Sequence, residues 1–331
     1  MRNDSGNIFS SDRDTERETK QFETGEWLFE SAFKRIVNSL ERHALERFDA
    51  LQEDDFGAYR DFKIHGVTQR FRWIPPGEFL MGSPESESER YDNEVQHRVE
   101  LTKGFWLADT ACTQQLWQAV MGDNPSKFKG KHRPVENVNW HDCVRFIERI
   151  NKENSGLNLS LPTEAQWEYA CRAGTMTPFS FGDNISSDFV NYVGKRDGTV
   201  DVKSLPPNSW GLYEMHGNVY EWCEDWFDDY PTGKAVDPKG PDEGVSRVVR
   251  GGSWLYFGRD CRSANRYRHL PDFRDLIIGF RLSRGQVALR PVAEPISEES
   301  EVAGTDTGEA TSEPGGEIED KLGELLGKKK P

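Results

Sequence analysis

Cysteine is the residue type in this chain best suited to redox or metal chemistry, and its spacing limits what it can do. The cysteines form no C-x-x-C pair, so the sequence spells out neither a zinc knuckle nor a dithiol redox site; the five are Cys112, Cys143, Cys171, Cys223 and Cys261. An odd number of cysteines, in a chain whose first residues carry no apolar signal segment, fits reduced thiols. We expect most of the five to be small buried side chains.

Other familiar catalytic motifs are missing from the sequence. No G-x-x-x-x-G-K, G-x-G-x-x-G or G-x-S-x-G stands in the chain, and no two of the seven histidines fall four residues apart. Histidines at that spacing would place two imidazoles on one helical face, as zinc proteases require. The common nucleotide-binding, hydrolase and zinc-protease functions are therefore not indicated.

The segment Gly217–Trp222, GNVYEW, could hold a hard cation. Gly217 permits a tight backbone turn and Glu221 follows closely, so backbone carbonyls and a carboxylate could converge on one ion. Calcium is the ion that such an oxygen site favours. The alternative is that Glu221 is an ordinary carboxylate paired with a basic side chain.

Three helices are expected in a stretch that is otherwise dense in Gly, Pro, Trp and Asn. The first lies between Thr113 and Gly122, and the second runs over residues 140–150. The third begins after Thr163, which forms a capping box with Gln166, and Gly174 supplies the left-handed residue that ends it. Few helices separated by short, turn-rich segments predict an irregular α+β fold.

The ends of the chain differ from this stretch. Residues 1–23 and 286–331 are polar and charged, so they cannot bury enough apolar surface to offset the entropy of ordering, and we expect both to be disordered. Residues 24–60 are expected to form an amphipathic helix, because apolar residues recur every three or four positions over Glu26–Leu51. Residues 65–285 then form the main domain.

Several segments of this domain resemble the formylglycine-generating enzyme, or sulfatase-modifying factor, family. They are WIPPGEFLMGSP (Trp73–Pro84), LPTEAQWEYACRAG (Leu161–Gly174), GLYEMHGNVYEWCEDW (Gly211–Trp226), RVVRGGSW (Arg247–Trp254), RSANR (Arg262–Arg266) and IGFRL (Ile278–Leu282). The resemblance implies the irregular, loop-rich C-type-lectin-like fold of that family, with short sheets and few helices.

The resemblance also identifies where a catalytic centre would lie. In the enzyme, two cysteines follow the Gly-Gly-Ser element, bind copper and activate oxygen; counted from Ser253, the equivalent positions here are Tyr256 and Cys261. One thiolate cannot supply the two-sulfur environment that favours Cu(I), and a tyrosine cannot exchange with a substrate cysteine. We therefore expect a pseudoenzyme without copper, in which Cys261 and Ser253 would be catalytic only if the chain were an oxidase after all.

Structural calcium is a second implication of the resemblance. The family carries calcium at the GNVYEW segment, where the ligands by position are Gly217, Val219 and Glu221. A second family site uses an Asn, its neighbour's carbonyl and a downstream Asp, which match Asn191, Tyr192 and either Asp197 or Asp201.

Large amphipathic side chains gather over residues 255–277, between the motif segments. Side chains of this kind dominate recognition surfaces. We expect a ligand-binding face made of Trp254, Leu255, Tyr256, Phe257, Arg259, Tyr267, Arg268, His269, Leu270, Phe273 and Leu276. For Leu276 and Ile277, a surface position and a core position fit the sequence equally well.

Our leading hypothesis is a non-catalytic domain that binds a protein or peptide ligand through this face. The resemblance extends to the variable proteins of diversity-generating retroelements, in which this segment is the diversified binding face. The alternatives are an oxidase that acts on a substrate cysteine, and a scaffold that acts through the helix of residues 24–60 and the tails.

Charge narrows the range of partners. The chain has 57 acidic and 42 basic residues, a formal net charge of -15. Nucleic acids and anionic membranes attract clustered Lys and Arg, so neither is an expected partner. No apolar stretch approaches the length of a spanning helix, and we expect a cytoplasmic location.

Overall fold

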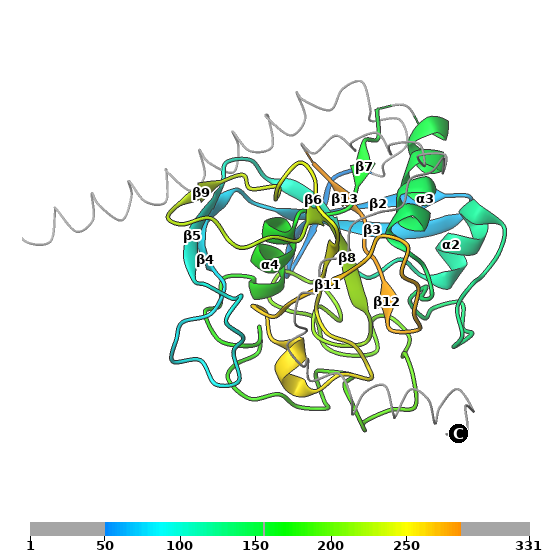
Figure 1. Ribbon diagram of the computed structural model, residues 1–331. Coiled ribbons are helices and arrows are strands. Elements are labelled where there is room, and N and C mark those ends of the chain that lie inside the picture. Colours follow the sequence, from blue (N-terminus) through cyan, green and yellow to red (C-terminus); the bar gives the residue numbers. More distant parts are fainter. Residues whose placement is uncertain (1–49, 155, 286–331) are drawn as a thin grey trace, which may run out of the picture. The chain divides into compact units, whose positions relative to one another are not determined.

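Near the start of the described chain lies a β-hairpin that is closed by a two-residue turn. The computed structural model describes residues 50–154 and 156–285 (Figure 1). Strands β2 (Gly57–Ile64) and β3 (Val67–Ile74) pair antiparallel. Between them His65 and Gly66 have φ of +47° and +81°, the two positive values that suit a tight hairpin turn.

This hairpin forms part of a six-stranded sheet in the order β1-β2-β3-β6-β13-β7. The other four strands are β1 (Gln52–Asp54), β6 (Phe105–Ala108), β7 (Leu159–Ser160) and β13 (Ser283–Arg284). The late strand β13 lies between β6 and β7 and pairs antiparallel with both. The sheet therefore joins the beginning and the end of the described chain.

Two smaller sheets complete the β structure. One has the order β11-β10-β8-β12 and the other the order β4-β5-β9. Their strands are β4 (Gly77–Met81), β5 (His97–Leu101), β8 (Tyr220–Trp226), β9 (Ala235–Val236), β10 (Arg247–Arg250), β11 (Arg266–His269) and β12 (Ile278–Gly279). Strand β8 is buried along nearly its whole length and lies at the centre of the fold (Figure 1).

The helices confirm the sequence prediction and extend it. They are α2 (Gln114–Met121), α3 (Trp140–Glu153), α4 (Glu164–Arg172) and the short 3-10 helix η1 (Gly258–Cys261). Thr163 and Gln166 form the expected capping box of α4, but the left-handed C-cap is Ala173, one residue before Gly174. Helix α3 has a second capping box, between Asn139 and Asp142, which the sequence analysis missed.

The helix predicted over residues 24–60 is wrong at its C-terminal end. Residues 52–54 and 57–64 are the strands β1 and β2, so the sheet begins ahead of residue 65 and residues 52–60 do not belong to a helix. Their side chains alternate between sheet faces, which a helical stripe cannot do. The rest of the expected helix, and residues 1–23 and 286–331, lie outside the described residues.

All five cysteines are buried and unpaired, as expected. The mixed α+β, loop-rich fold is also confirmed. Within the described ranges, no helix is both long and apolar enough to cross a bilayer.

Candidate functional site

The arginines of the motif segments form a buried frame. Arg250 of RVVRGGSW pairs with Glu168 on α4 and donates to the backbone carbonyls of Ala264 and Ser263. Arg250 and Glu168 are both fully buried. Because an unpaired charge would be costly at such a site, each partner depends on the other. This pair fixes the segment that follows β10 against α4.

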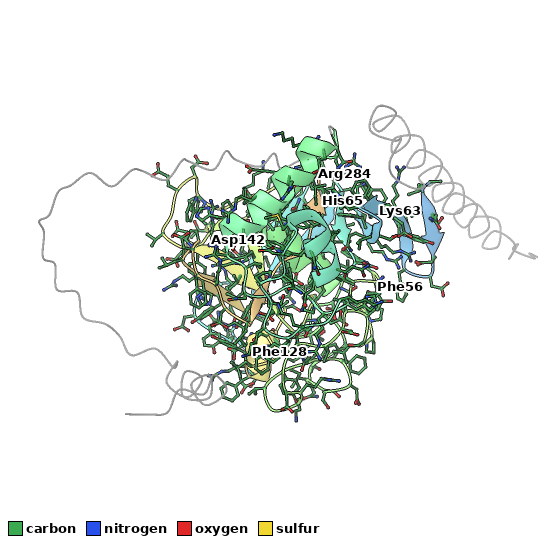
Figure 2. All side chains as sticks on the ribbon, turned by 90° about the vertical axis from the view of Figure 1, so that its right-hand side faces the viewer. Phe56, Lys63, His65, Phe128, Asp142 and Arg284 are labelled. Carbon is green, nitrogen blue, oxygen red and sulfur yellow. The ribbon has the colours of Figure 1, made fainter. Side chains whose placement is uncertain are left out.

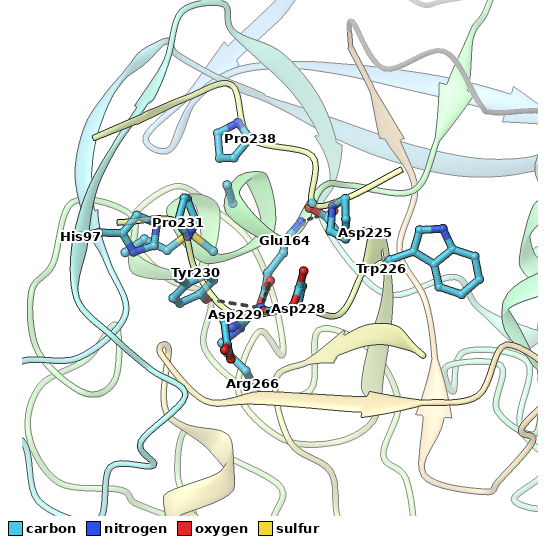
Figure 3. A pocket seen from close by; sticks show the side chains of 14 residues that line it. His97, Glu164, Asp225, Trp226, Asp228, Asp229, Tyr230, Pro231, Pro238 and Arg266 are labelled. Atoms are coloured by element: carbon cyan, nitrogen blue, oxygen red, sulfur yellow. Dashed lines mark hydrogen bonds and ion pairs between the residues drawn. The ribbon is translucent and has the colours of Figure 1, made fainter. Parts of the chain in front are cut away.

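Both ends of RSANR are held in the same way. Arg262 donates to the carboxylates of Glu94 and Glu87, with each nitrogen–oxygen distance 2.7 Å. Arg266 donates from Nε and Nη2 to the two carboxylate oxygens of Glu164, at 2.6 and 2.8 Å. Figure 3 shows this second pair beside Tyr230, whose hydroxyl also donates to Glu164.

The hollow at Glu164 is too small to be a ligand site. Its volume is about 50 Å³, which is room for ordered water only. Its carboxylates serve the frame: Asp225 accepts a hydrogen bond from the backbone N–H of Glu164, while burial raises the pKa of Asp225 to about 8. We therefore assign these carboxylates a structural role.

The expected thiol position is sealed in the core. Cys261 is fully buried, and burial raises the pKa of its thiol well above the usual range. Its Sγ is 3.6 Å from the carbonyl oxygen of Phe257, to which it donates. Ser253 is also fully buried, and its Oγ accepts from the N–H of Leu255. A protonated, enclosed thiol is a poor nucleophile and a poor metal ligand.

Tyr256, at the other expected cysteine position, belongs to a row of aromatic rings. Its ring lies 6.2 Å from that of Tyr267 on β11, measured between centroids. Tyr267 contacts His269 edge to face at 5.0 Å, and His269 stacks on Phe273 at 4.1 Å. We call Tyr256, Tyr267, His269 and Phe273 the aromatic stripe.

The stripe is half-buried along its length and open at one end. Phe273 is 37% exposed and the neighbouring Leu270 is 57% exposed. Burial lowers the pKa of His269 to about 4, so its imidazole is neutral at pH 7. The stripe therefore offers uncharged rings to solvent, with the exposed Arg268 beside them.

The loop that carries Leu270 and Phe273 is clamped to the N-terminus of α3. Trp140 donates its backbone N–H to the carbonyl of Pro271 at 3.0 Å. Arg274 donates to both carboxylate oxygens of Asp142, at 2.7 and 3.0 Å. In Figure 2 Asp142 lies on α3, well separated from the hairpin that carries Lys63 and His65. The stripe thus stands on a fixed support.

Some residues expected on the binding face are core residues. Trp254, Leu255 and Leu276 are 2%, 3% and 8% exposed, so they do not line a surface. Trp254 donates its indole N–H to the carbonyl of Leu276 and meets Phe128 edge to face. For Leu276 and Ile277 both a surface and a core position were open, and the structure places both in the core. Their apolar side chains support the face from below.

The other members of the predicted face are accessible. Phe257 and Arg268 are exposed, and Arg259 is partly buried. Phe257 and Arg259 do not lie in the stripe: they line a hollow of about 550 Å³ together with Phe179, Ile185 and Tyr192. This hollow could not be predicted from the sequence, because its walls come from segments far apart in the chain.

Glu221 does not fit the calcium site expected at GNVYEW. Both oxygens of its carboxylate accept from Arg281, at 2.6 and 2.7 Å, and one also accepts from the Trp167 indole at 2.7 Å. A cation at Glu221 would have to displace a buried guanidinium. Glu221 is instead a carboxylate paired with a basic side chain, which is the alternative that the sequence left open.

Asn191 fits an oxygen-liganded cation better. It is fully buried, and its Oδ1 has no hydrogen-bond partner among the described residues. Its backbone bridges Gly217, and its carbonyl accepts from the N–H of Asn218 at 2.8 Å. The Oγ1 of Thr199, also buried, likewise lacks a hydrogen-bond partner in the described part of the chain. An orphan carbonyl oxygen at this depth calls for a donor or a cation.

The remaining predicted ligands contribute less to such a site. Asp197 and Asp201 are exposed, and Asp201 lies 4.0 Å from Arg133. Val219 is buried in the segment that follows Gly217. No cluster of three His, Cys, Asp or Glu side chains suited to a metal occurs among residues 50–154 and 156–285. Any cation here would be held mainly by amide and backbone oxygens.

Both the sequence and the fold are similar to those of known proteins. Residues 63–286 match the family of the sulfatase-modifying factor enzyme 1-like domain. The serine/threonine-protein kinase pkn1 of Chlamydia caviae is 38% identical over 205 residues, which cover 60% of this chain and 29% of that protein. The formylglycine-generating enzyme of Streptomyces coelicolor is 36% identical over 185 residues, which cover 50% of this chain and 57% of that protein. The chain spans less than two thirds of either relative.

Two solved structures resemble the fold over most of their own length. Treponema denticola variable protein 1 is 30% identical, with a TM-score of 0.63 that covers 68% of this chain and 98% of that one. PvdO from Pseudomonas aeruginosa is 24% identical, with a TM-score of 0.61 over 73% of this chain and all of that one. The family match covers more than half of the sequence, and the chain belongs to the sulfatase-modifying factor enzyme 1-like domain family.

Proposed function

We propose that this domain binds a protein or peptide ligand through the aromatic stripe and does not catalyse oxidation. The observation that carries the proposal is the continuous ring contact from Tyr256 to Phe273 at a partly exposed surface. Rings fixed against one another lose little entropy when a ligand covers them, and they bury much apolar area. Recognition surfaces depend on anchors of this kind.

The clamp on α3 supports the same function. The loop of residues 270–275 is joined to the start of the helix and the residues just before it by contacts to Asn137, Asn139, Trp140, His141 and Asp142. A loop held in its binding conformation does not spend ligand affinity on ordering. The resemblance to a variable protein adds weight to a binding role, and a diversified face is part of the proposal.

An oxidase remains the second candidate, because formylglycine-generating enzymes are among the relatives. Its chemistry would have to pass through Cys261 and Ser253, both fully buried. With Tyr256 at the other position, the pair of thiolates that copper needs would have to come from elsewhere in the chain. This makes the domain a pseudoenzyme in our proposal.

Two further features belong to the proposal. Calcium would be held by the Asn191 amide oxygen and nearby backbone carbonyls of the Gly217–Val219 segment, where it would stiffen the connection into β8. A cytoplasmic location is supported by the five unpaired thiols, because oxidising compartments favour disulfides.

The experiment that tests the function uses binders selected from a displayed random-peptide library on the full chain. Their dissociation constants are then measured against Phe273→Ala and against Phe56→Ala, a matched control because both side chains are 37% exposed. We expect Phe273→Ala to weaken most binders by about tenfold or more, and Phe56→Ala to leave them unchanged. Binders indifferent to Phe273 and to Leu270→Ser would count against the stripe.

A Cu(I) titration of the reduced chain distinguishes an oxidase from a binding domain. The chain competes with a chromophoric chelator while a cysteine-containing peptide is assayed for oxidation. Stoichiometric copper binding that is lost in Cys261→Ser, together with peptide turnover, would establish the oxidase and remove our proposal. We expect neither.

A further inference from the structure

The hollow beside Phe257 is formed by three separate parts of the chain. Its volume is about 550 Å³, and it is lined by Ser88, Glu89, Pro178, Phe179, Asp183, Asn184, Ile185, Tyr192, Phe257, Gly258, Arg259 and Arg262. Val193, next to Tyr192, donates its N–H to the carbonyl of Tyr256 at 2.9 Å. The hollow therefore adjoins the aromatic stripe, at the turn between Tyr256 and Phe257.

The floor of the hollow is apolar and tightly supported. Phe179 stacks on Phe181 at 5.3 Å and packs in one buried cluster with Val190 and Cys261. Gly258 lets η1 approach closely, because a Cβ there would lie 3.0 Å from Ile185. Contacts within the chain thus hold the walls of the hollow in place, as in a preformed binding site.

The rim of the hollow is acidic. The loop of residues 85–94, ESESERYDNE, has five acidic residues against one arginine and supplies Glu89 to the lining. Asp183 lies in the lining as well, and both carboxylates are exposed. Within the described ranges, neither side chain has an ion-pair partner.

The two basic side chains of the lining do not neutralise this rim. Arg262 is already shared between Glu87 and Glu94. Arg259 lies over the rings of Tyr91 and Phe257, 5.7 Å from each centroid, and 4.0 Å from Asp260. The carboxylates of Glu89 and Asp183 are left to attract a cation.

We propose that the hollow receives a lysine or arginine side chain of the protein or peptide that covers the aromatic stripe; this rests on the proposed function. The apolar stem of such a side chain would lie on Ile185 and Phe257, and its cationic head would lie near the carboxylates of Glu89 and Asp183. Long basic side chains bury their stems and keep their charged ends at a wet rim. Carboxylates without an ion-pair partner attract such a charged end.

The probe for this proposal is N-acetyl-arginine methylamide, titrated into the isotope-labelled full chain and followed by TROSY spectra. The control is N-acetyl-citrulline methylamide, which has the same stem and shape but no charge. We expect saturable shifts of the Ile185 and Gly258 amides with the arginine probe, and binding at least about fivefold weaker with citrulline.

Matched variants test the rim. Asp183→Asn with Glu89→Gln should weaken the arginine probe by about three- to tenfold at low salt. Asp188→Asn with Glu85→Gln removes the same charge from exposed positions outside the lining and should leave binding unchanged. Equal binding of both probes, or an equal loss in both variants, would overturn the proposal.

A third variant decides whether the occupant is external. The chain ends in a basic segment, Lys328–Lys330. If replacing these three lysines with glutamine tightens binding of the probe, the segment competes for the hollow and the external partner is ruled out. Phe273→Ala should leave the shifts at Ile185 intact, so a failure at the hollow is distinct from a failure of the stripe.

Discussion

Arg281 lies across the carboxylate of Glu221, with Nε 2.6 Å from Oε2 and Nη2 2.7 Å from Oε1. The side chains of both residues are at most 1% exposed. Arg281 also donates to the backbone carbonyls of Ala108 and Tyr213. One guanidinium thus connects β8 to two segments outside its own sheet.

Removing Arg281 should therefore destabilise the whole domain. We expect Arg281→Ala to lower the free energy of unfolding by about 3 to 5 kcal/mol, because it leaves the buried Glu221 charge without its partner. Denaturant unfolding measures this loss, and Arg281→Met with Glu221→Gln should recover part of it. If millimolar calcium restored the free energy of unfolding of Arg281→Ala, Glu221 would instead be able to hold that ion.

Asn191 provides the test of calcium. If its unpartnered Oδ1 holds the ion, calcium should raise the melting temperature of the native chain, since a ligand that binds only the folded state stabilises it. Asn191→Ala should abolish this rise. Asp197→Asn should retain it, because the Asp197 side chain is exposed. A melting temperature that calcium does not change would exclude a structural ion at Asn191.

The sequence predicted features that depend on near neighbours in the chain. The capping box of Thr163 and Gln166 spans three residues, and the motif segments carried enough of the family pattern to predict the fold. The burial of the cysteines followed from their residue type. These features need no knowledge of which distant segments meet.

The sequence could not predict pairings between distant segments. Arg262 and Glu94 are 168 positions apart, and Tyr91 donates to Asp260 across 169. For the same reason the residue types of Trp254 and Leu276 suit a binding face, although the two side chains meet in the core. Apolar residues in a loop-rich segment carry no periodicity that separates inside from outside.

Arg274 should position the binding face without touching the ligand. Arg274→Ala removes both hydrogen bonds to Asp142, and we expect amides of residues 270–276 to exchange hydrogen faster while global stability changes little. Ligand affinity should fall by about two- to tenfold through this loss of order. Arg274→Lys keeps the charge and should restore part of the affinity. Unchanged exchange in Arg274→Ala would mean that the remaining contacts to α3 hold the loop without Arg274.

Buried carboxyl groups should make the domain less stable as the pH rises above neutrality. Burial raises the pKa of both Glu136 and Glu214 to about 7, and that of Asp225 to about 8, all above the values of an unfolded chain. The folded state therefore binds more protons between about pH 4 and 8, so the stability that these protons contribute is lost as the pH rises across this range, and the loss levels off above about pH 8.

Glu136 allows this linkage to be measured at one residue. Its Oε1 accepts from the N–H of Phe128, whereas its buried Oε2 has no hydrogen-bond partner among the described residues. Glu136→Gln mimics the protonated acid, so it should remove roughly 0.5 to 1 kcal/mol of the stability lost between pH 6.5 and 8.5. Urea unfolding of native and variant chains at both pH values gives the difference. A variant whose pH dependence equals that of the native chain would show that Glu136 is already ionised at pH 6.5.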